Sequence, residues 1–186
     1  RSTLLASSAA SDVYKRQAYK GIREFVELAV KMPEYRFILV LNETQENINS
    51  FLNSIHGKAT KGANLKIYPR QSDTTPFYMK ASIVLNLSDK EKVIETFGMT
   101  VLEAMSAGLP VIVPTVGGVA ELVENGKNGY KIDAKDLELI EKRIHEMLSD
   151  KQNYIGMANN ALKKARLFCA KNMISAIETL LQNGIR

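Results

Sequence analysis

Short apolar runs alternate along this chain with segments whose apolar residues recur at helical spacing. The run at 37–41 (FILVL) follows an amphipathic segment at 21–32, and the run at 110–114 (PVIVP) follows a helical pattern at 98–107. A run that is apolar at every position is typical of a parallel strand buried on both faces. This alternation predicts an α/β fold, a doubly wound, Rossmann-like parallel sheet with helices on both faces.

The same patterns predict the remaining elements of the sheet. Ligands bind beyond the carboxyl ends of the strands in sheets of this kind, so the loops after the strands are the first candidates for a functional site. The expected strands are 37–41, 65–68, 83–87, 110–114 and 129–132. The expected helices are 21–32, 44–55, 75–80, 98–107, 119–124, 137–148, 152–168 and 171–182.

The first seventeen residues differ from the rest of the chain. Residues 1–17 (RSTLLASSAASDVYKRQ) have neither helical nor strand periodicity and resemble the translated adapter tails that contaminate sequence assemblies. We expect residues 1–17 to be a non-native or disordered segment, and residues 18–186 to form one domain. Without that segment, 22 basic and 19 acidic residues remain, and the formal charge falls from +5 to +3.

Composition excludes several other classes of protein. The basic residues are spread out, without the interleaved aromatic residues of a single-strand binder, so no nucleic-acid partner is expected. The single cysteine excludes an internal disulfide, and His56 and His145 lie far apart, so no metal site is expected. No apolar run approaches the ~20 residues of a membrane span. We expect a cytoplasmic protein, with peripheral contact with the inner membrane face left open.

A segment between two of the strands carries the strongest chemical signal. Glu95 and Glu103 lie eight positions apart around a Phe97–Gly98 turn that opens into a helix. The first backbone N–H groups of a helix have no partner within it, so those of Gly98, Met99 and Thr100 favour an anion such as phosphate. A carboxylate accepts two hydroxyl donors, which suits a ribose or hexose. The segment therefore predicts a site for a phosphorylated, hydroxyl-rich ligand.

Each part of this signal also has a structural interpretation. The order Thr100-Val101-Leu102-Glu103 fits a capping box, in which Glu103 would serve the backbone. The pair Gly117-Gly118 is either a tight turn between a strand and a helix or a point where a ligand approaches the backbone. Local chemistry leaves both alternatives open.

The whole segment resembles a known family, the retaining glycosyltransferases of the GT-B fold, family 4, in its donor-binding C-terminal domain. Their pattern E-x-F-G-x-x-x-L-E-A-M-x-x-G-x-P-V-I is followed by a G-G-x-x-E-L-V turn and an N-G-Y strand. The chain matches it from Glu95 to Ile112, then from Gly117 to Val123, and then from Asn128 to Tyr130. The resemblance extends from about Lys20 to the C-terminus and implies one half of a GT-B fold.

The resemblance implies a role for each matching position. Glu95 would lie beside the transferred sugar as the catalytic carboxylate, and Glu103 would hold the ribose hydroxyls. Lys20 would neutralise the diphosphate, whose negative charge grows as the glycosidic bond breaks. Arg70 falls where such proteins meet the base. The remaining substrate-binding positions are Phe97, Gly98, Met99, Thr100, Leu102, Gly117 and Gly118.

The resemblance also implies a function for the whole protein. It would be a hexosyltransferase of the EC 2.4 class that uses a UDP- or GDP-linked sugar, with no cofactor and no metal. The acceptor, a saccharide or a lipid, would bind a missing N-terminal domain, so the chain alone would be inactive. The family's first strand and its Gly-Arg pair are not apparent in 12–16, and the loop at 41–44 lacks the usual glycines. The alternative function is a non-catalytic nucleotide-binding or interaction module of the same fold.

Overall fold

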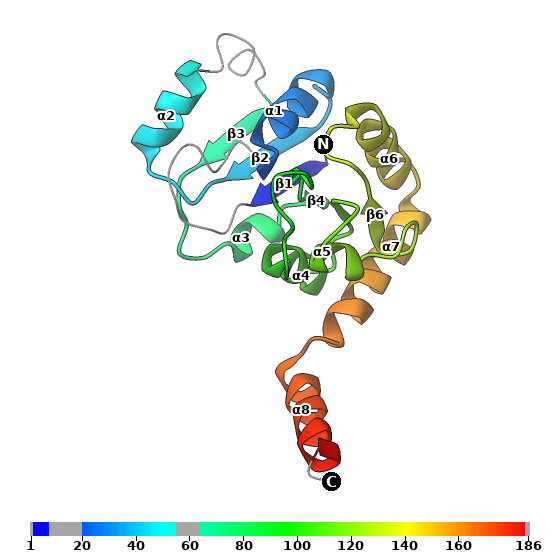
Figure 1. The fold of residues 1–186 in the computed structure, drawn as a ribbon. Coiled ribbons are helices and arrows are strands. Elements are labelled where there is room, and N and C mark those ends of the chain that lie inside the picture. Colours follow the sequence, from blue (N-terminus) through cyan, green and yellow to red (C-terminus); the bar gives the residue numbers. More distant parts are fainter. Residues whose placement is uncertain (1, 8–19, 55–63, 185–186) are drawn as a thin grey trace.

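The computed structural model describes residues 2–7, 20–54 and 64–184, and its centre is a six-stranded parallel sheet (Figure 1). The strand order is β3-β2-β1-β4-β5-β6, and every pair of neighbours is parallel. This confirms the predicted doubly wound sheet. The strands are β1 (Thr3–Ser7), β2 (Arg36–Val40), β3 (Leu65–Tyr68), β4 (Ile83–Leu85), β5 (Val111–Val113) and β6 (Gly129–Lys131).

Helices cover both faces of the sheet, as the alternation predicts. One core cluster joins α1 and α6 to residues such as Phe37 and Ile83, and the other joins α4, α5 and α7 to Val84 and Val111. The helices are α1 (Ile22–Lys31), α2 (Gln45–Ser54), α3 (Thr75–Tyr78), α4 (Met99–Ser106), α5 (Gly118–Glu121), α6 (Leu137–Ser149), α7 (Lys151–Arg166) and α8 (Ala170–Gly184).

Strand β1 corrects one expectation. Residues Thr3–Ser7 of the segment expected to be non-native or disordered form a central strand, paired with β2 on one side and β4 on the other. Leu4 and Leu5 have exposed fractions of 0% and 1% and belong to the cores on opposite faces of the sheet. Residues 8–17 lie outside the described residues, and a foreign origin for the segment stays a prediction.

The position of β1 determines where the two halves of the sheet diverge. Strands β1, β2 and β3 succeed one another towards one edge, and β4, β5 and β6 towards the other. Adjacent β1 and β4 therefore form the switch point, beyond whose carboxyl ends a ligand site is expected. The turn that enters α1 and the loop that joins β4 to α4 both lie at this point.

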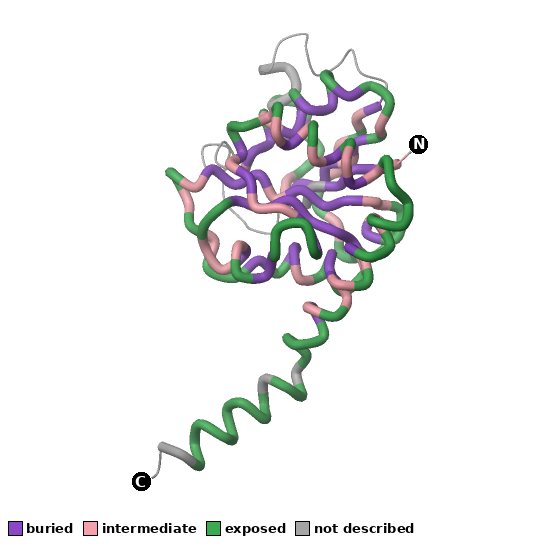
Figure 2. Tube along the Cα trace, turned by 90° about the vertical axis from the view of Figure 1, so that its right-hand side faces the viewer, coloured by how far each residue is buried: buried purple, intermediate pink, exposed green. Residues whose placement is uncertain are grey.

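Helix α8 projects away from the body of the fold and is exposed along its described length (Figure 2). Its apolar side chains include Ile174, Ile177, Leu180 and Leu181, with exposed fractions of 49–71%. Their spacing of three, four and seven residues gives the helix one apolar stripe. No helix in the described ranges is both long and apolar enough to cross a membrane.

Replacing Leu5 by alanine should test the place of β1 in the sheet. Removing a fully buried leucine side chain leaves a cavity, and we expect a loss of about 2–5 kcal/mol in the free energy of unfolding. Leu180→Ala, on the exposed stripe of α8, is the matched control and should change it by less than about 0.5 kcal/mol. Denaturant unfolding measures both. Equal stability of the Leu5→Ala and unaltered chains would contradict a structural role for β1.

Candidate functional site

The turn that leads into α1 packs directly on the end of β4. Gly21 has a φ of 71°, a left-handed conformation that favours glycine, and a Cβ at this position would collide with the carbonyl oxygen of Leu87. Lys20 is the residue before it and is half-buried. The fold therefore brings Lys20, which the sequence predicts as a diphosphate ligand, to the switch point between β1 and β4.

Helix α4 begins at Met99, and Gly98 is its N-cap. The N-cap makes no side-chain hydrogen bond, and the first intrahelical bond described runs from the Leu102 N–H to the Gly98 carbonyl. The capping box considered for Thr100 and Glu103 is therefore wrong, because that motif requires Thr100 as the N-cap and the helix starts two positions earlier, after Gly98. The sequence predicts a free N–H at Met99. In the structure this group donates to the Phe97 carbonyl oxygen at 3.1 Å.

Glu95 lies in the β4–α4 loop and is held at two points. Its carboxylate oxygen Oε2 accepts a hydrogen bond of 2.8 Å from the side-chain amide of Asn86, at the end of β4. Its carbonyl oxygen accepts one of 2.8 Å from the N–H of Gly118. The side chain is half-buried. Its backbone and one carboxylate oxygen are thus held, and no hydrogen bond among the described residues engages the other oxygen.

The two consecutive glycines allow this loop contact. A Cβ at Gly118 would collide with the Thr96 carbonyl oxygen, and one at Gly117 would lie 2.6 Å from the Glu95 carbonyl oxygen. Gly117 also has a φ of 89°. Of the two interpretations of the pair, the structure supports a tight turn that lets two backbones meet. Binding of a ligand by these glycines stays a prediction.

Glu103 faces a partner that the sequence did not suggest. The hydroxyl of Tyr78, the last residue of α3, donates to Glu103 Oε2 at 2.9 Å and lies 3.4 Å from the Thr100 carbonyl oxygen. The Tyr78 ring is buried, whereas Glu103 is exposed. Because an ionised carboxylate can accept about four hydrogen bonds, the tyrosine orients Glu103 and leaves it able to accept further donors. Neither Tyr78 nor Asn86 belongs to the family pattern, so the sequence reasoning missed both.

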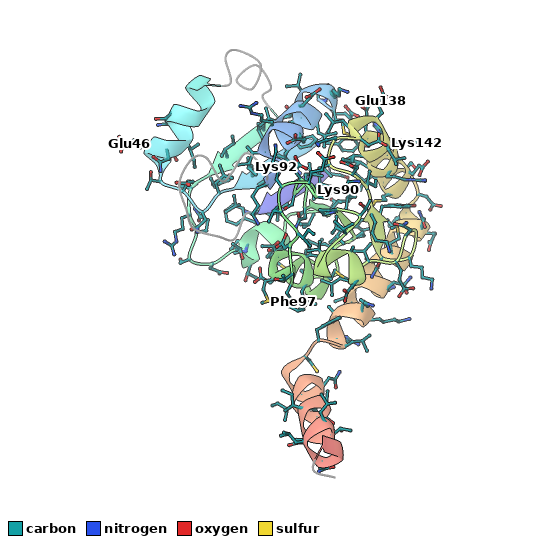
Figure 3. All side chains as sticks on the ribbon, viewed as in Figure 1. Glu46, Lys90, Lys92, Phe97, Glu138 and Lys142 are labelled. Carbon is teal, nitrogen blue, oxygen red and sulfur yellow. The ribbon has the colours of Figure 1, made fainter. Side chains whose placement is uncertain are left out.

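The residues around the start of α4 differ widely in exposure. Phe97 and Met99 have exposed fractions of 45% and 51%, whereas Thr100 is buried and Leu102 is half-buried against the core. Figure 3 shows Phe97 at the end of the body from which α8 projects. Its ring lies 6.1 Å from that of Phe168, at the junction of α7 and α8. An apolar rim therefore borders the helix terminus that the phosphate would approach.

Arg70 lies in the exposed loop after β3. Its backbone N–H donates to the Glu43 carbonyl oxygen at 2.9 Å, which joins this loop to the one after β2. This hydrogen bond places the backbone of Arg70 beside the loop after β2. Grouping Arg70 with the two carboxylates around one ligand stays a prediction.

A network of ion pairs joins the β4–α4 loop to the loop before α6. Lys135 pairs with Asp89 at 3.7 Å, and Lys90 pairs with Asp133 at 2.8 Å. The backbone N–H of Glu91 lowers the pKa of Asp89, and the hydrogen bond from Lys90 lowers that of Asp133. The network anchors the segment that leads to Glu95.

No metal site is apparent in the described part of the chain, where no three His, Cys, Asp or Glu side chains gather to hold an ion. His145 on α6 lies 3.0 Å from the hydroxyl of Tyr35, and His56 lies outside the described residues. Independence from a metal stays a prediction.

Comparison with known sequences matches residues 13–166 to the family described as Glycosyl transferases group 1. A sucrose synthase of Denitrovibrio acetiphilus is 43% identical over 74 residues, which is 38% of this chain and 9% of that protein. An N-acetyl-alpha-D-glucosaminyl L-malate synthase of Bacillus anthracis is 27% identical over 118 residues, 63% of this chain and 30% of that protein. The matched region is therefore less than a third of either relative.

Comparison with solved structures shows the same fold in a longer protein. Anabaena HepE in complex with UDP matches with a TM-score of 0.79 at 22% identity, over 97% of this chain and 48% of HepE. The complex of HepE with UDP-glucose matches with a TM-score of 0.78 at 23% identity. The chain thus spans about half of that protein, and the likeness confirms a Rossmann-like half of a GT-B fold.

Replacing Gly118 by alanine should displace the Glu95 loop. The added methyl group would meet the Thr96 carbonyl oxygen, and overpacking of this kind costs about 1–3 kcal/mol in the free energy of unfolding. Gly156→Ala is the matched control, because a Cβ there meets nothing within 4 Å and a helical alanine should stabilise the chain slightly. Thermal unfolding measures both. Equal melting temperatures of the two variants would contradict the close approach at Gly118.

Acid should weaken the ion-pair network. Because the pKa values of Asp89 and Asp133 are lowered in the folded chain, their contribution to stability is present above the ordinary aspartate pKa of about 3.9. It should be lost as the pH falls below that value, through the lowered folded pKa values. NMR titration of the aspartate carboxyls measures this directly. Titration of both groups at or above the ordinary value would contradict the network.

Proposed function

We propose that this chain, which belongs to the glycosyl transferases group 1 family, is the donor-binding half of a retaining family 4 hexosyltransferase. The substrate is a nucleoside-diphosphate sugar, linked to UDP or GDP, and the acceptor is a saccharide or a lipid. The observation that carries the proposal is the pair of carboxylates, Glu95 and Glu103, oriented on either side of the α4 N-terminus by Asn86 and Tyr78.

The chemistry of the edge suits each part of this substrate. Glu95 accepts hydrogen bonds from the hydroxyls of the transferred sugar, and Glu103 accepts them from the ribose. The diphosphate lies between them at the start of α4, where the helix dipole favours negative charge. Lys20 stabilises the charge that develops on the leaving diphosphate as the glycosidic bond breaks, so no metal is required. The likeness to HepE, solved with UDP and with UDP-glucose, supports this choice of donor.

The acceptor belongs to the part of the protein beyond this chain. The chain covers 48% of HepE, and its own edge offers one wall of a site. The exposed apolar stripe of α8 supports a neighbouring domain, because contiguous apolar surface of this kind is typical of a protein interface. We infer that the isolated chain binds the donor but does not transfer the sugar.

Titration calorimetry of the chain with nucleotides tests donor binding. We expect binding of either UDP or GDP, and of the corresponding hexose conjugates. Glu103→Ala should weaken binding of the nucleotide roughly 10-fold or more, because hydrogen bonds to a charged group are lost. Glu178→Ala, on exposed α8, is the matched control and should leave the affinity unchanged. No binding of any nucleotide or nucleotide sugar would refute the proposed function.

A further inference from the structure

Asn86 lies where β4 leaves the sheet, and its hydrogen bonds hold it rigidly. Its backbone N–H donates to the Ile112 carbonyl oxygen at 2.8 Å, which continues the ladder to β5. Its side-chain oxygen accepts from the N–H of Ser88 at 3.1 Å, and its side-chain nitrogen donates to Glu95 at 2.8 Å. The opposite amide orientation would bring its oxygen against the carboxylate, so these two bonds together fix which way the group points.

The side chain of Glu95 depends on this amide for its orientation. The backbone of Glu95 is held by Gly118, whereas the amide of Asn86 is the hydrogen-bond donor described for its half-buried side chain. Without the amide, the carboxylate could rotate into solvent. With it, one oxygen is occupied and the other has a defined position, and this is the form in which a sugar hydroxyl would meet it.

We propose that Asn86 is a positioning residue, which orients the Glu95 carboxylate towards the transferred sugar while leaving its charge in place. This inference rests on the proposed function of Glu95. A lysine or arginine at this position would orient the carboxylate but would also neutralise it. A neutral amide donor leaves the negative charge available to the sugar hydroxyls and to the positive charge that develops at the anomeric carbon.

The size of the effect follows from the freedom that the amide removes. A side chain that is already ordered before the ligand binds should raise the affinity for that ligand about 2- to 13-fold. The effect should be confined to the sugar, because the nucleoside and diphosphate are bound by other groups. Asn86 should therefore influence discrimination between a nucleotide sugar and its parent nucleotide, and not affinity for the nucleotide itself.

Calorimetric titration of Asn86→Ala tests this separation. The probes are UDP-glucose, UDP-galactose, UDP-N-acetylglucosamine and GDP-mannose, each beside its parent nucleotide, and the readout is the affinity ratio of the best-bound pair. Asn86→Ala should lower the affinity for the nucleotide sugar about 2- to 13-fold relative to its parent nucleotide. The affinity for the nucleotide itself should stay unchanged. Asn160→Ala is the matched control, because its side-chain amide donates to the Lys127 carbonyl oxygen, outside the site, and it should shift neither quantity.

A double-mutant cycle separates positioning from a general structural effect. If Asn86 acts through the Glu95 side chain, the shift caused by Asn86→Ala should disappear when it is made in a Glu95→Ala chain, which has no acceptor left for the amide. An equal loss of affinity for nucleotide and nucleotide sugar would overturn the inference, as would a shift that persists in the Glu95→Ala chain.

The variant Asn86→Asp makes the affinity ratio depend on pH, which gives a second test. Near pH 8 two carboxylates would face each other and repel, whereas near pH 5 a shared proton could restore the hydrogen bond. The shift in the ratio should therefore be larger near pH 8 than near pH 5 for Asn86→Asp, but not for Asn86→Ala. The same shift at both values would overturn the inference. Failure of the unaltered chain to bind any nucleotide would instead refute the proposed function, and the inference with it.

Discussion

The candidate site depends on one close contact between two loops at the carboxyl edge of the sheet. The N–H of Gly118 donates to the carbonyl oxygen of Glu95, and the absence of a side chain at Gly118 lets the two backbones meet. This contact joins the β5–α5 loop to the β4–α4 loop. It determines where Glu95 lies relative to the N-terminus of α4, whose N-cap, Gly98, itself has no room for a side chain beside Val119.

The sequence predicts well the strands that are bounded by turn residues. It misses β1, which has no such residues at its ends. The run at 110–114 ends in proline on both sides, and the structure has β5 at Val111–Val113. Strand β1 has only two large apolar residues, Leu4 and Leu5, among small and hydroxyl side chains. A central parallel strand has no alternation to reveal it, and its place is fixed by pairing with β2 and β4, which is a non-local property.

The candidate site shows the same division between local and non-local information. The motif predicts that Glu95 and Glu103 flank a helix start, because their spacing is local. It does not predict Asn86 and Tyr78, because the fold alone brings these side chains to the carboxylates. One signal was nevertheless present, an asparagine within the apolar run at 83–87 (IVLNL), because a polar side chain at the end of a buried strand needs a hydrogen-bond partner. The capping box, one of the two alternatives that local chemistry left open, is wrong because the N-cap of α4 is Gly98 and not Thr100.

The partners of the two carboxylates explain how the edge can serve an anionic, hydroxyl-rich ligand. Both described donors, the amide of Asn86 and the phenol of Tyr78, are neutral, so each orients a carboxylate without cancelling its charge. The cations that precede Glu95 in its loop, Lys90 and Lys92, pair with other acids, Asp133 and Asp89. Negative charge is therefore retained where hydroxyls would donate, and the positive end of α4 lies between the two carboxylates. Under the proposed function, this separation would let one ligand place its phosphates and its hydroxyls on neighbouring groups of opposite electrostatic character.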